Sequence, residues 1–496
     1  MNRVSCISID LINADKPPAS LAFLAGACET TNKEYQCVSL NSQLLDQLSS
    51  DEYNQLYLEL KINPDIRSVS NNVTSVLDAT INKVSQFNTE CVAVSIFSFM
   101  QMPIAYLFLS MLREKLPKIT IIAGGPGVTY TTPDGITNGS RLLKKDLVDY
   151  YCLGEGDKVL INFLQGNRDM LGLNGKKFKT ESWVPQIEDL TENYLLPSYK
   201  KINTQQYHNL ENKSSAVFSI STSRGCVRAC TFCDISSTWK KFRFRSGKSV
   251  ADEILKHHID VGAVHFTIVD SLINGSLKSF NEFNQEMINV KKTQPGLQDF
   301  SYNGMFIVRD KKSHTEEFFA TMKEAGCESL AIGVETGSDR LRFDMNKKFT
   351  NADLDHHLEM CQKYGIKNTF LTFIGYPTET ADDYKQTLEM LDRYQKYLID
   401  DTILGINHSG IFGLLPDTPV FNNREEIGIH WEYHENQAAG LSWTNENNPT
   451  LTVKERAHRD LLFRKRAVEL RYPIPYSDRY LAYMRQITPD FIPISD

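Results

Sequence analysis

The chain has 496 residues, of which 41% are hydrophobic and 23% are charged, and its formal net charge is −7. This length is enough for about two to four domains with sizeable cores. The mildly acidic balance argues against a nucleic-acid-binding protein, which would carry an excess of basic residues. Ten cysteines in so long a chain do not form a disulfide scaffold, so we expect a reduced, cytoplasmic setting.

The first 165 residues alternate between strand and helix patterns, and the N-terminal segment has no signal-peptide cleavage pattern. Runs rich in β-branched residues predict strands at 3–10, 35–41, 91–99, 119–128 and 148–157. Helices are predicted at 19–31 and 158–165. Such alternation predicts a parallel, doubly wound, Rossmann-like sheet in a first domain at 1–165.

One uncharged stretch, 91–112, is long enough to cross a bilayer. Its first part, CVAVSIFSF, resembles a buried strand, and Gln101 and Pro103 interrupt the run. Pro103 suits the first turn of a helix. We therefore predict a strand followed by a helix, and no membrane span.

A glycine-rich turn, GGPG, follows the fourth strand of this domain. Its residues Gly124, Gly125 and Gly127 provide a backbone that a ligand can approach closely. Ligands of doubly wound sheets lie beyond the carboxyl ends of the strands, where this turn is expected. The turn is not a GxGxxG with an acidic residue at the usual distance, which argues against a nicotinamide cofactor.

A second alternation follows a polar segment, 166–215, that we predict to be a linker. The expected strands are 217–225, 263–270, 301–308, 329–336, 368–376 and 405–415. Six strand–helix units predict a partial (β/α)6 barrel at 216–415, with the chemistry at the carboxyl ends of the strands. The fold class is therefore α/β, and the last segment, 416–496, is predicted to be mostly helical.

Three cysteines, Cys226, Cys230 and Cys233, follow the first barrel strand with the spacing C-x3-C-x2-C. A zinc site would need a fourth ligand, such as Asp234 or a distant histidine. A redox pair of Cys230 and Cys233 would leave Cys226 unexplained. A 4Fe–4S cluster held by three thiolates would leave one iron open for a bidentate small molecule.

The cysteine motif, with Phe232 before its last cysteine, resembles that of the radical S-adenosylmethionine (SAM) superfamily. AGCESLAIGVETGSDRL, MNKKFT and FLTFIGYPTET are similar to motifs of the subfamily with an N-terminal cobalamin-binding-like domain, as are PPASLAFLAG, IIAGGPGV and VDYYCLGEGD. The resemblance covers about residues 1–415 and implies a 4Fe–4S cluster whose open iron binds SAM. Reductive cleavage of SAM would give a 5′-deoxyadenosyl radical that abstracts hydrogen from a substrate.

The resemblance implies roles for residues near the ends of the barrel strands. Asp270 would meet the substrate or the SAM amino group, Arg309 the SAM carboxylate, and Glu335 the ribose or the amino group. The residues that would flank the adenine are Phe232, Phe373, Ile374, Gly375 and Tyr376.

Each of these residues also has a structural interpretation. Asp270 and Glu335 could simply cap the ends of their strands, and Arg309 could form an ion pair at the surface. Phe373 and Ile374 could be part of the hydrophobic core. Lys347 and Lys348 are expected to be solvated, and His408, Tyr302 and Tyr376 are candidates to face the cavity.

Cobalamin binding by the first domain cannot use an imidazole from that domain, because residues 1–207 contain no histidine. The subfamily's histidine after GGP is Gly127 here. One hypothesis is that cobalamin binds without this ligand, surrounded by 11–18, 95–102 and 124–128. The other is that the domain is vestigial.

Four functions follow from these observations. The first is a cobalamin-dependent transfer of a methyl group to an unactivated carbon. The alternative is a radical rearrangement, oxidation or cyclisation without cobalamin. An RNA methylthiotransferase would need a further three-cysteine cluster and a C-terminal β-barrel, and a corrinoid- or metal-binding sensor would not need Arg309 and Glu335. An external electron donor such as flavodoxin or ferredoxin is the expected partner, and no sequence feature indicates the substrate.

Overall fold

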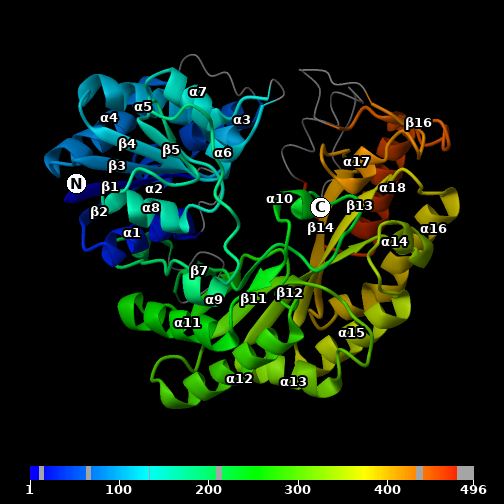
Figure 1. The fold of residues 1–496 in the computed structure, drawn as a ribbon. Helices are drawn as coiled ribbons and strands as arrows, with labels where there is room; N and C mark the ends of the chain where they lie inside the picture. The colour runs from blue at the N-terminus through cyan, green and yellow to red at the C-terminus, as the bar shows by residue number, and fades with distance from the viewer. Residues whose placement is uncertain (11–15, 63–68, 133–134, 208–214, 432–439, 477–496) are drawn as a thin grey trace. The chain divides into compact units, whose positions relative to one another are not determined.

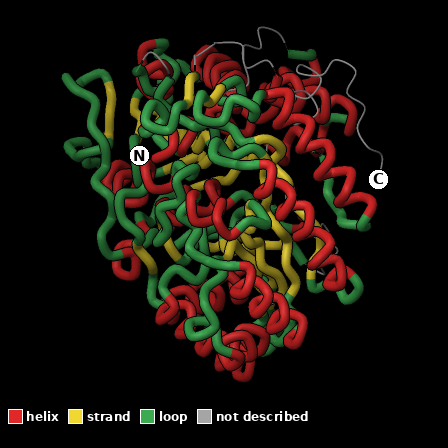
Figure 2. The backbone as a smooth tube through the Cα atoms, turned by 90° about the vertical axis from the view of Figure 1, so that its right-hand side faces the viewer, coloured by secondary structure: helices red, strands yellow, loops and turns green. Residues whose placement is uncertain are grey.

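The computed structural model describes residues 1–10, 16–62, 69–132, 135–207, 215–431 and 440–476 (Figure 1). Contacts within the chain define two units, Met1–Ser219 with Glu253–His265, and Ile220–Asp252 with Phe266–Asp496. The chain forms two six-stranded sheets, and helices pack on each of them (Figure 2).

The sheet of the first unit is parallel and doubly wound, as predicted. Its strand order is β2-β1-β3-β4-β5-β6, and only the pairing of β6 with β5 is antiparallel among the described strands. The strands are β1 Arg3–Ile9, β2 Glu34–Ser39, β3 Cys91–Ile96, β4 Thr120–Gly124, β5 Tyr150–Cys152 and β6 Leu173–Gly175. Because β6 lies within the segment predicted to be a linker, the sheet continues past residue 165.

Helices cover both faces of this sheet (Figure 1). On one face α1 packs against α8, and on the other α4 packs against α2 and α5. The helices are α1 Ala19–Thr30, α2 Leu40–Gln47, α3 Ser50–Ile62, α4 Asn71–Gln86, η1 Phe99–Gln101, α5 Met102–Lys115, α6 Pro126–Thr129, α7 Asn138–Lys144, α8 Asp157–Leu164, α9 Leu190–Asn193 and η2 Gln205–Tyr207. Pro103 occupies the first turn of α5, as expected. Across the described residues, no helix combines the length and apolar character needed to cross a membrane.

The second sheet has all six predicted strands, in the order β14-β13-β12-β11-β10-β7. They are β7 Val217–Ile220, β10 His265–Ile268, β11 Ser301–Phe306, β12 Cys327–Glu335, β13 Lys367–Ile374 and β14 Ile403–Ile411. β11 pairs in parallel with β12, β12 with β13, and β13 with β14. In the part of the chain that is described, β7 and β14 are edge strands, so this is a partial barrel rather than a closed one.

Helices follow the strands of this sheet on its outer side (Figure 1). The helices that follow β7 along the chain are α10 Ile235–Thr238, α11 Gly247–Val261, α12 Leu277–Thr293, α13 Glu316–Ala325, α14 Asp339–Asp344, α15 Asn351–Tyr364, α16 Ala381–Tyr394, η4 Gln395–Leu398, α17 Pro419–Asn422 and α18 Val453–Glu469, of which α10 and α17 lie at the end of the barrel (Figure 1). Two small hairpins pair β8 Ser223–Arg224 with β9 Arg243–Phe244, and β15 Ile429–His430 with β16 Thr444–Asn445. The C-terminal region contributes α18, which packs on β13, β14 and α16.

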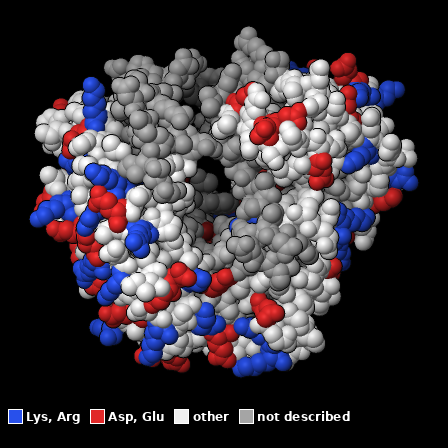
Figure 3. Space-filling view, turned by 180° about the vertical axis from the view of Figure 1, so that it is seen from behind, with Lys and Arg blue, Asp and Glu red and all other residues white. Residues whose placement is uncertain are grey.

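Charged side chains of both signs are interspersed over the face shown in Figure 3. Among the described residues of that face, neither sign forms a broad field. Such mixing accords with the small net charge, and the expectation that no nucleic acid binds stays a prediction.

Candidate active site

The three cysteines lie in a loop that follows the carboxyl end of β7, as the sequence predicted. The base of this loop is closed by the β8–β9 hairpin, in which Ser223 pairs with Phe244 and Arg224 with Arg243. The cysteines fall between β8 and the short helix α10. The loop therefore opens at the end of the barrel where the chemistry of this fold takes place.

Asp270 fastens the start of this loop. Its buried carboxylate accepts hydrogen bonds from the Ser221 hydroxyl (3.0 Å), the Thr222 backbone N–H (2.9 Å) and the Ser223 hydroxyl (2.9 Å). Burial raises the pKa of Asp270 to about 6, and these hydrogen bonds oppose the rise. The structure thus supports the strand-end cap for Asp270, and its contact with substrate or SAM stays a prediction.

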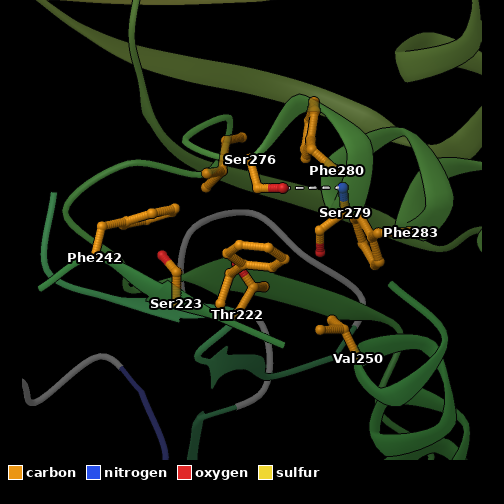
Figure 4. A pocket seen from close by; sticks show the side chains of 10 residues that line it. Thr222, Ser223, Phe242, Val250, Ser276, Ser279, Phe280 and Phe283 are labelled. Carbon is orange, nitrogen blue, oxygen red and sulfur yellow. Dashed lines mark hydrogen bonds between the residues drawn. The ribbon is translucent and has the colours of Figure 1, made fainter. Parts of the chain in front are cut away.

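A small pocket lies beside the residues that Asp270 fastens (Figure 4). Thr222 contributes to its wall together with the rings of Phe242, Phe280 and Phe283. At its rim Ser276 caps α12, because its hydroxyl accepts a hydrogen bond from the Ser279 N–H (3.2 Å). The base of the cysteine loop therefore rests against an apolar layer.

The three thiols are half-buried and unpaired with one another. Burial raises the pKa of all three, and the nearby charge of Lys347 opposes the rise in each case. Within the described ranges, no group of three or more His, Cys, Asp or Glu side chains could hold a single metal ion. Three cysteine thiols carried by one loop are the kind of donors that iron–sulfur clusters use, so the residues present fit a 4Fe–4S cluster.

The segment after α14 holds the cysteine loop from its other side. The Thr231 N–H donates to the Met345 carbonyl (3.1 Å), and the Asn346 amide donates to the Ala229 carbonyl (2.8 Å). The Lys347 ammonium nitrogen lies 5.8 Å from the centroid of the Phe232 ring. Three consecutive residues thus contact residues on both sides of Cys230.

Lys347 is buried, and the expectation that it is solvated is wrong. Its side chain is 9% exposed and forms an ion pair with Glu335, whose side chain is 10% exposed (Nζ to Oε1, 2.9 Å). Glu335 ends β12 with a positive φ of 62°, next to a register shift between β12 and β13. A Cβ atom at Gly333 would lie 2.5 Å from Glu335 Oε1 and 2.6 Å from Lys347 Nζ, so glycine leaves the room for this pair. Lys348 is exposed, as expected.

Arg309 follows β11 and is held by the loop after β10. Its Nη2 donates to the carbonyls of Asn274 (3.1 Å) and Gly275 (3.2 Å), so it is not in a surface ion pair. Its buried Nε has no hydrogen-bond partner. Burial and the neighbouring Arg228 lower the pKa of Arg309, while Cys226 opposes this shift. A buried N–H without an acceptor beside a cysteine thiol suits an anionic ligand, and its pairing with the SAM carboxylate stays a prediction.

Aromatic residues at the end of β13 pack against the cysteine loop. Phe373 contacts Phe232 edge-on with a centroid separation of 5.2 Å. The hydroxyls of Tyr376 and Thr231 lie 2.8 Å apart. Ile374 is fully buried, as plain core would be. The loop therefore has aromatic neighbours on the side where the resemblance places adenine.

Gly375 is supported by the C-terminal helix. It has a φ of +82°, and a Cβ atom there would lie 2.6 Å from Cγ of Arg456 in α18. Its N–H donates to Glu379 (2.9 Å), which in turn accepts from Arg459 of α18 (3.0 Å). The backbone that follows β13 is therefore fixed by residues outside the barrel.

Two of the residues considered for the cavity have structural partners instead. His408 Nε2 lies 2.6 Å from Asp460 of α18, and its Nδ1 lies 2.7 Å from the Thr372 hydroxyl. Tyr302 is fully buried and donates to Asn284 (2.6 Å). Neither contact could be read from the sequence, because the partners are distant along the chain.

The carboxyl end of the first sheet carries the predicted ligand turn. Gly125 has a φ of +98° and precedes α6, and a Cβ atom at Gly124 would lie 3.8 Å from Cβ of Cys152, an ordinary contact distance. Gly127 is instead packed against the loop after β3, because a Cβ there would lie 2.7 Å from the Ser98 carbonyl oxygen. The roles of these three glycines stay predictions. Residues 11–15 of the expected cofactor loop lie outside the described residues.

Further residues that the sequence analysis did not single out lie at this end of the sheet. Asp10 follows β1 and is buried with Oδ1 unpartnered, and burial raises its pKa to about 7. Gln101 is buried with Nε2 unpartnered. Phe97 and Phe99 are exposed, and Phe99 stacks on exposed Tyr130 at a centroid distance of 4.5 Å. Buried polar atoms without partners beside exposed aromatic rings are features of a ligand site.

Comparison with known proteins gives one family match and several relatives. The radical SAM superfamily matches residues 220–391. An uncharacterized methyltransferase of Pyrococcus horikoshii is 24% identical over 76% of this chain and 74% of its own length. The anaerobic magnesium-protoporphyrin IX monomethyl ester cyclase of Rubrivivax gelatinosus is 26% identical over 75% of this chain, which spans 61% of that enzyme.

Two solved structures share the fold over most of the chain. The methyltransferase TsrM from Kitasatospora setae, with cobalamin and a [4Fe-4S] cluster bound, has a TM-score of 0.62 at 17% identity over 92% of this chain and 85% of its own. OxsB, a cobalamin-dependent S-adenosylmethionine radical enzyme with aqua-cobalamin and SAM bound, has a TM-score of 0.61 at 15% identity. The match covers 86% of this chain and 61% of OxsB.

The matched segment contains the cysteine loop, Asp270, Arg309, Glu335 and the end of β13. Membership implies a 4Fe–4S cluster and SAM as cofactors, and the donor set of the loop fits that cluster. The assignment of each residue to a cofactor atom stays a prediction. Residues 220–391 of this chain are therefore a radical SAM domain.

Proposed function

We propose that this radical SAM enzyme uses cobalamin to transfer a methyl group to an unactivated carbon. Cys226, Cys230 and Cys233 would hold the cluster, and Arg309 would bind the SAM carboxylate through its unpartnered Nε. The bound cluster supplies a one-electron reduction of SAM that yields a hydrogen-abstracting radical, and bound cobalamin supplies the methyl group. Electrons would come from an external donor such as flavodoxin or ferredoxin in a cytoplasmic setting.

The observation that carries the cobalamin part of this proposal is the group of residues at the carboxyl end of the first sheet. Phe99 and Tyr130 offer a stacked apolar surface that suits a large macrocycle. Asp10 and Gln101 offer buried polar atoms without partners, which suit its amide side chains. Since residues 1–207 contain no histidine, the cobalt would bind without an imidazole from that segment.

The second candidate is a cyclisation or oxidation that does not use cobalamin. It is favoured by the similarity to the cyclase of Rubrivivax gelatinosus, which extends over 75% of this chain. In that case the first unit would hold no corrin, and the residues at its carboxyl end would serve the substrate or the fold.

The test is anaerobic reconstitution with iron, sulfide and hydroxocobalamin, followed by measurement of iron, cobalt and 5′-deoxyadenosine. The proposal expects bound cobalt with a corrin absorption spectrum, and SAM cleavage by the reduced protein. The double variant Phe99→Ala/Tyr130→Ala is expected to lose cobalamin but to keep its iron. Ile259→Ala, which removes another exposed apolar side chain, serves as the control.

The outcomes separate the candidates. SAM cleavage without bound cobalt would favour the second candidate over the first. Loss of cobalamin to the same extent in Ile259→Ala would remove the support for an aromatic corrin surface. Absence of both iron and SAM cleavage would refute the cluster assignment itself.

A further inference from the structure

Lys347 and Glu335 form a buried ion pair at the end of β12, beside the cysteine loop. Their side chains meet at 2.9 Å and are about one-tenth exposed. Two charges that are withdrawn from water in this way cost free energy, which their attraction only partly offsets. Such a pair is weak support for stability and is therefore a candidate for a functional role.

The local backbone is shaped around this pair. Gly333 leaves space that any Cβ atom would take from both charged groups. Glu335 has a left-handed backbone, which residues other than glycine adopt only at a cost in free energy. A register shift between β12 and β13 lies at the same point. The backbone is thus strained at the point where the Glu335 carboxylate meets the Lys347 ammonium.

The lysine is directed to the cysteine loop by its own segment. Met345 and Asn346 hydrogen-bond to Thr231 and Ala229, on either side of Cys230. The Lys347 ammonium lies over the Phe232 ring at 5.8 Å. Lys347 is thus bound to the loop by its neighbours and carries its charge toward the thiols.

The geometry brings the ammonium close to the segment that carries the cysteines. Phe232, over whose ring Lys347 Nζ lies, directly precedes Cys233, and the two residues before Lys347 are bound on either side of Cys230. A buried charge acts strongly on its surroundings because little water screens it. We therefore expect the ammonium to act on any group that the cysteine loop holds.

We propose that the buried charge of Lys347 sets the reduction potential of the cluster that the cysteine loop would hold. This inference rests on the proposed cluster site. The potential of an iron–sulfur cluster depends on net charge and on its surroundings. A buried ammonium stabilises the reduced, more negative state and raises the potential, and the Glu335 carboxylate has the opposite effect.

The test measures the midpoint potential of the reconstituted cluster by anaerobic titration in the absence of SAM, together with iron content. Lys347→Met keeps the volume of the side chain and removes its charge. We expect the equilibrium constant for reduction of the cluster to fall about tenfold in this variant. This corresponds to a midpoint potential that is about 59 mV more negative for a one-electron reduction. Lys347→Arg is expected to restore the potential. Lys348→Met, an adjacent exposed lysine, is expected to leave it unchanged.

Variants at Glu335 separate charge from packing. Glu335→Gln is expected to shift the potential in the positive direction. The double variant Lys347→Met/Glu335→Gln is expected to lie between wild type and Lys347→Met. If packing rather than charge sets the midpoint potential, the potential of the double variant will instead differ from that of the wild type by more than the potential of either single variant does.

Two results would overturn different parts of the reasoning. If the wild-type protein holds a cluster and Lys347→Met has the potential of Lys348→Met, this inference is wrong and the proposed function stands. If the wild-type protein assembles no cluster, both are wrong. If Lys347→Met folds poorly, Glu335→Gln and the double variant still test the inference. Their midpoint potentials are expected to shift in opposite directions from that of the wild type.

Discussion

Removal of the Asp270 carboxylate should release the start of the cysteine loop. In Asp270→Ala the hydroxyl donors can turn to other acceptors, since Ser221 Oγ lies 3.2 Å from the Ser223 carbonyl and Ser223 Oγ lies 3.4 Å from that of Leu272. The backbone N–H of Thr222 has a fixed direction, so it cannot rotate toward another acceptor as the hydroxyl groups can. A buried N–H that loses its acceptor costs about 1–3 kcal/mol, which corresponds to about a 5- to 150-fold increase in local opening.

The assay is amide hydrogen exchange followed by mass spectrometry of a peptide that covers residues 217–225. We expect the exchange of this peptide to accelerate within the range above in Asp270→Ala. In Asp270→Asn the effect should be smaller, because the amide keeps one oxygen that can accept from Thr222. Iron retained after reconstitution should fall in the same order, since Cys226 follows the released segment.

The control is Asp310→Ala, which removes an exposed carboxylate that accepts from the Lys312 and Ser313 N–H groups. This variant should accelerate exchange after β11 and leave residues 217–225 unchanged. Unaltered exchange of that peptide in Asp270→Ala would refute the role of Asp270 as the fastening of the loop. Equal acceleration in both variants would show a general loosening of the barrel instead.

Two further predictions concern groups whose burial is known. Cys230→Ala should abolish iron binding and 5′-deoxyadenosine formation while leaving the urea unfolding transition of the apoprotein in place, because a half-buried thiol contributes little packing; residual SAM cleavage would contradict this. Because burial raises the pKa of Asp10 to about 7, the folded state holds a proton that the unfolded state has released, so this stability is present at low pH and is lost as the pH rises through 7. Between pH 6 and 8, the free energy of unfolding of the wild type, measured with urea, should therefore fall by about 1.4 kcal/mol relative to that of Asp10→Asn. If the free energies of unfolding of the two proteins change equally with pH, the result would argue against a buried carboxyl group at Asp10.

The sequence predicted the strands and the cysteine loop because both are local signals. Each of the six barrel strands is an apolar run bounded by polar segments, and the three cysteines lie within eight positions. β6 was missed because its three residues, LNG, carry no strand pattern and gain their place only by pairing with β5.

The burial of Lys347 depends on non-local contacts that the sequence pattern does not contain. Lys347 and Lys348 are adjacent and chemically identical, yet one is buried and the other exposed. What distinguishes them is the room left by Gly333 and the carboxylate of Glu335, twelve residues upstream. A glycine two positions before a strand-end glutamate was the only local signal. His408 is similar, because its partner Asp460 follows it by 52 residues.

The segment by which the superfamily is defined ends at residue 391, before α18 begins. Yet Arg456 and Arg459 of α18 hold the turn at Gly375, and Asp460 of the same helix binds His408 of β14. A substitution in α18 can therefore disturb the end of β13 although it lies outside the matched segment. A chimaera joined at residue 391 would separate the turn at Gly375 from the helix that contacts it, so a graft of this barrel should extend through α18.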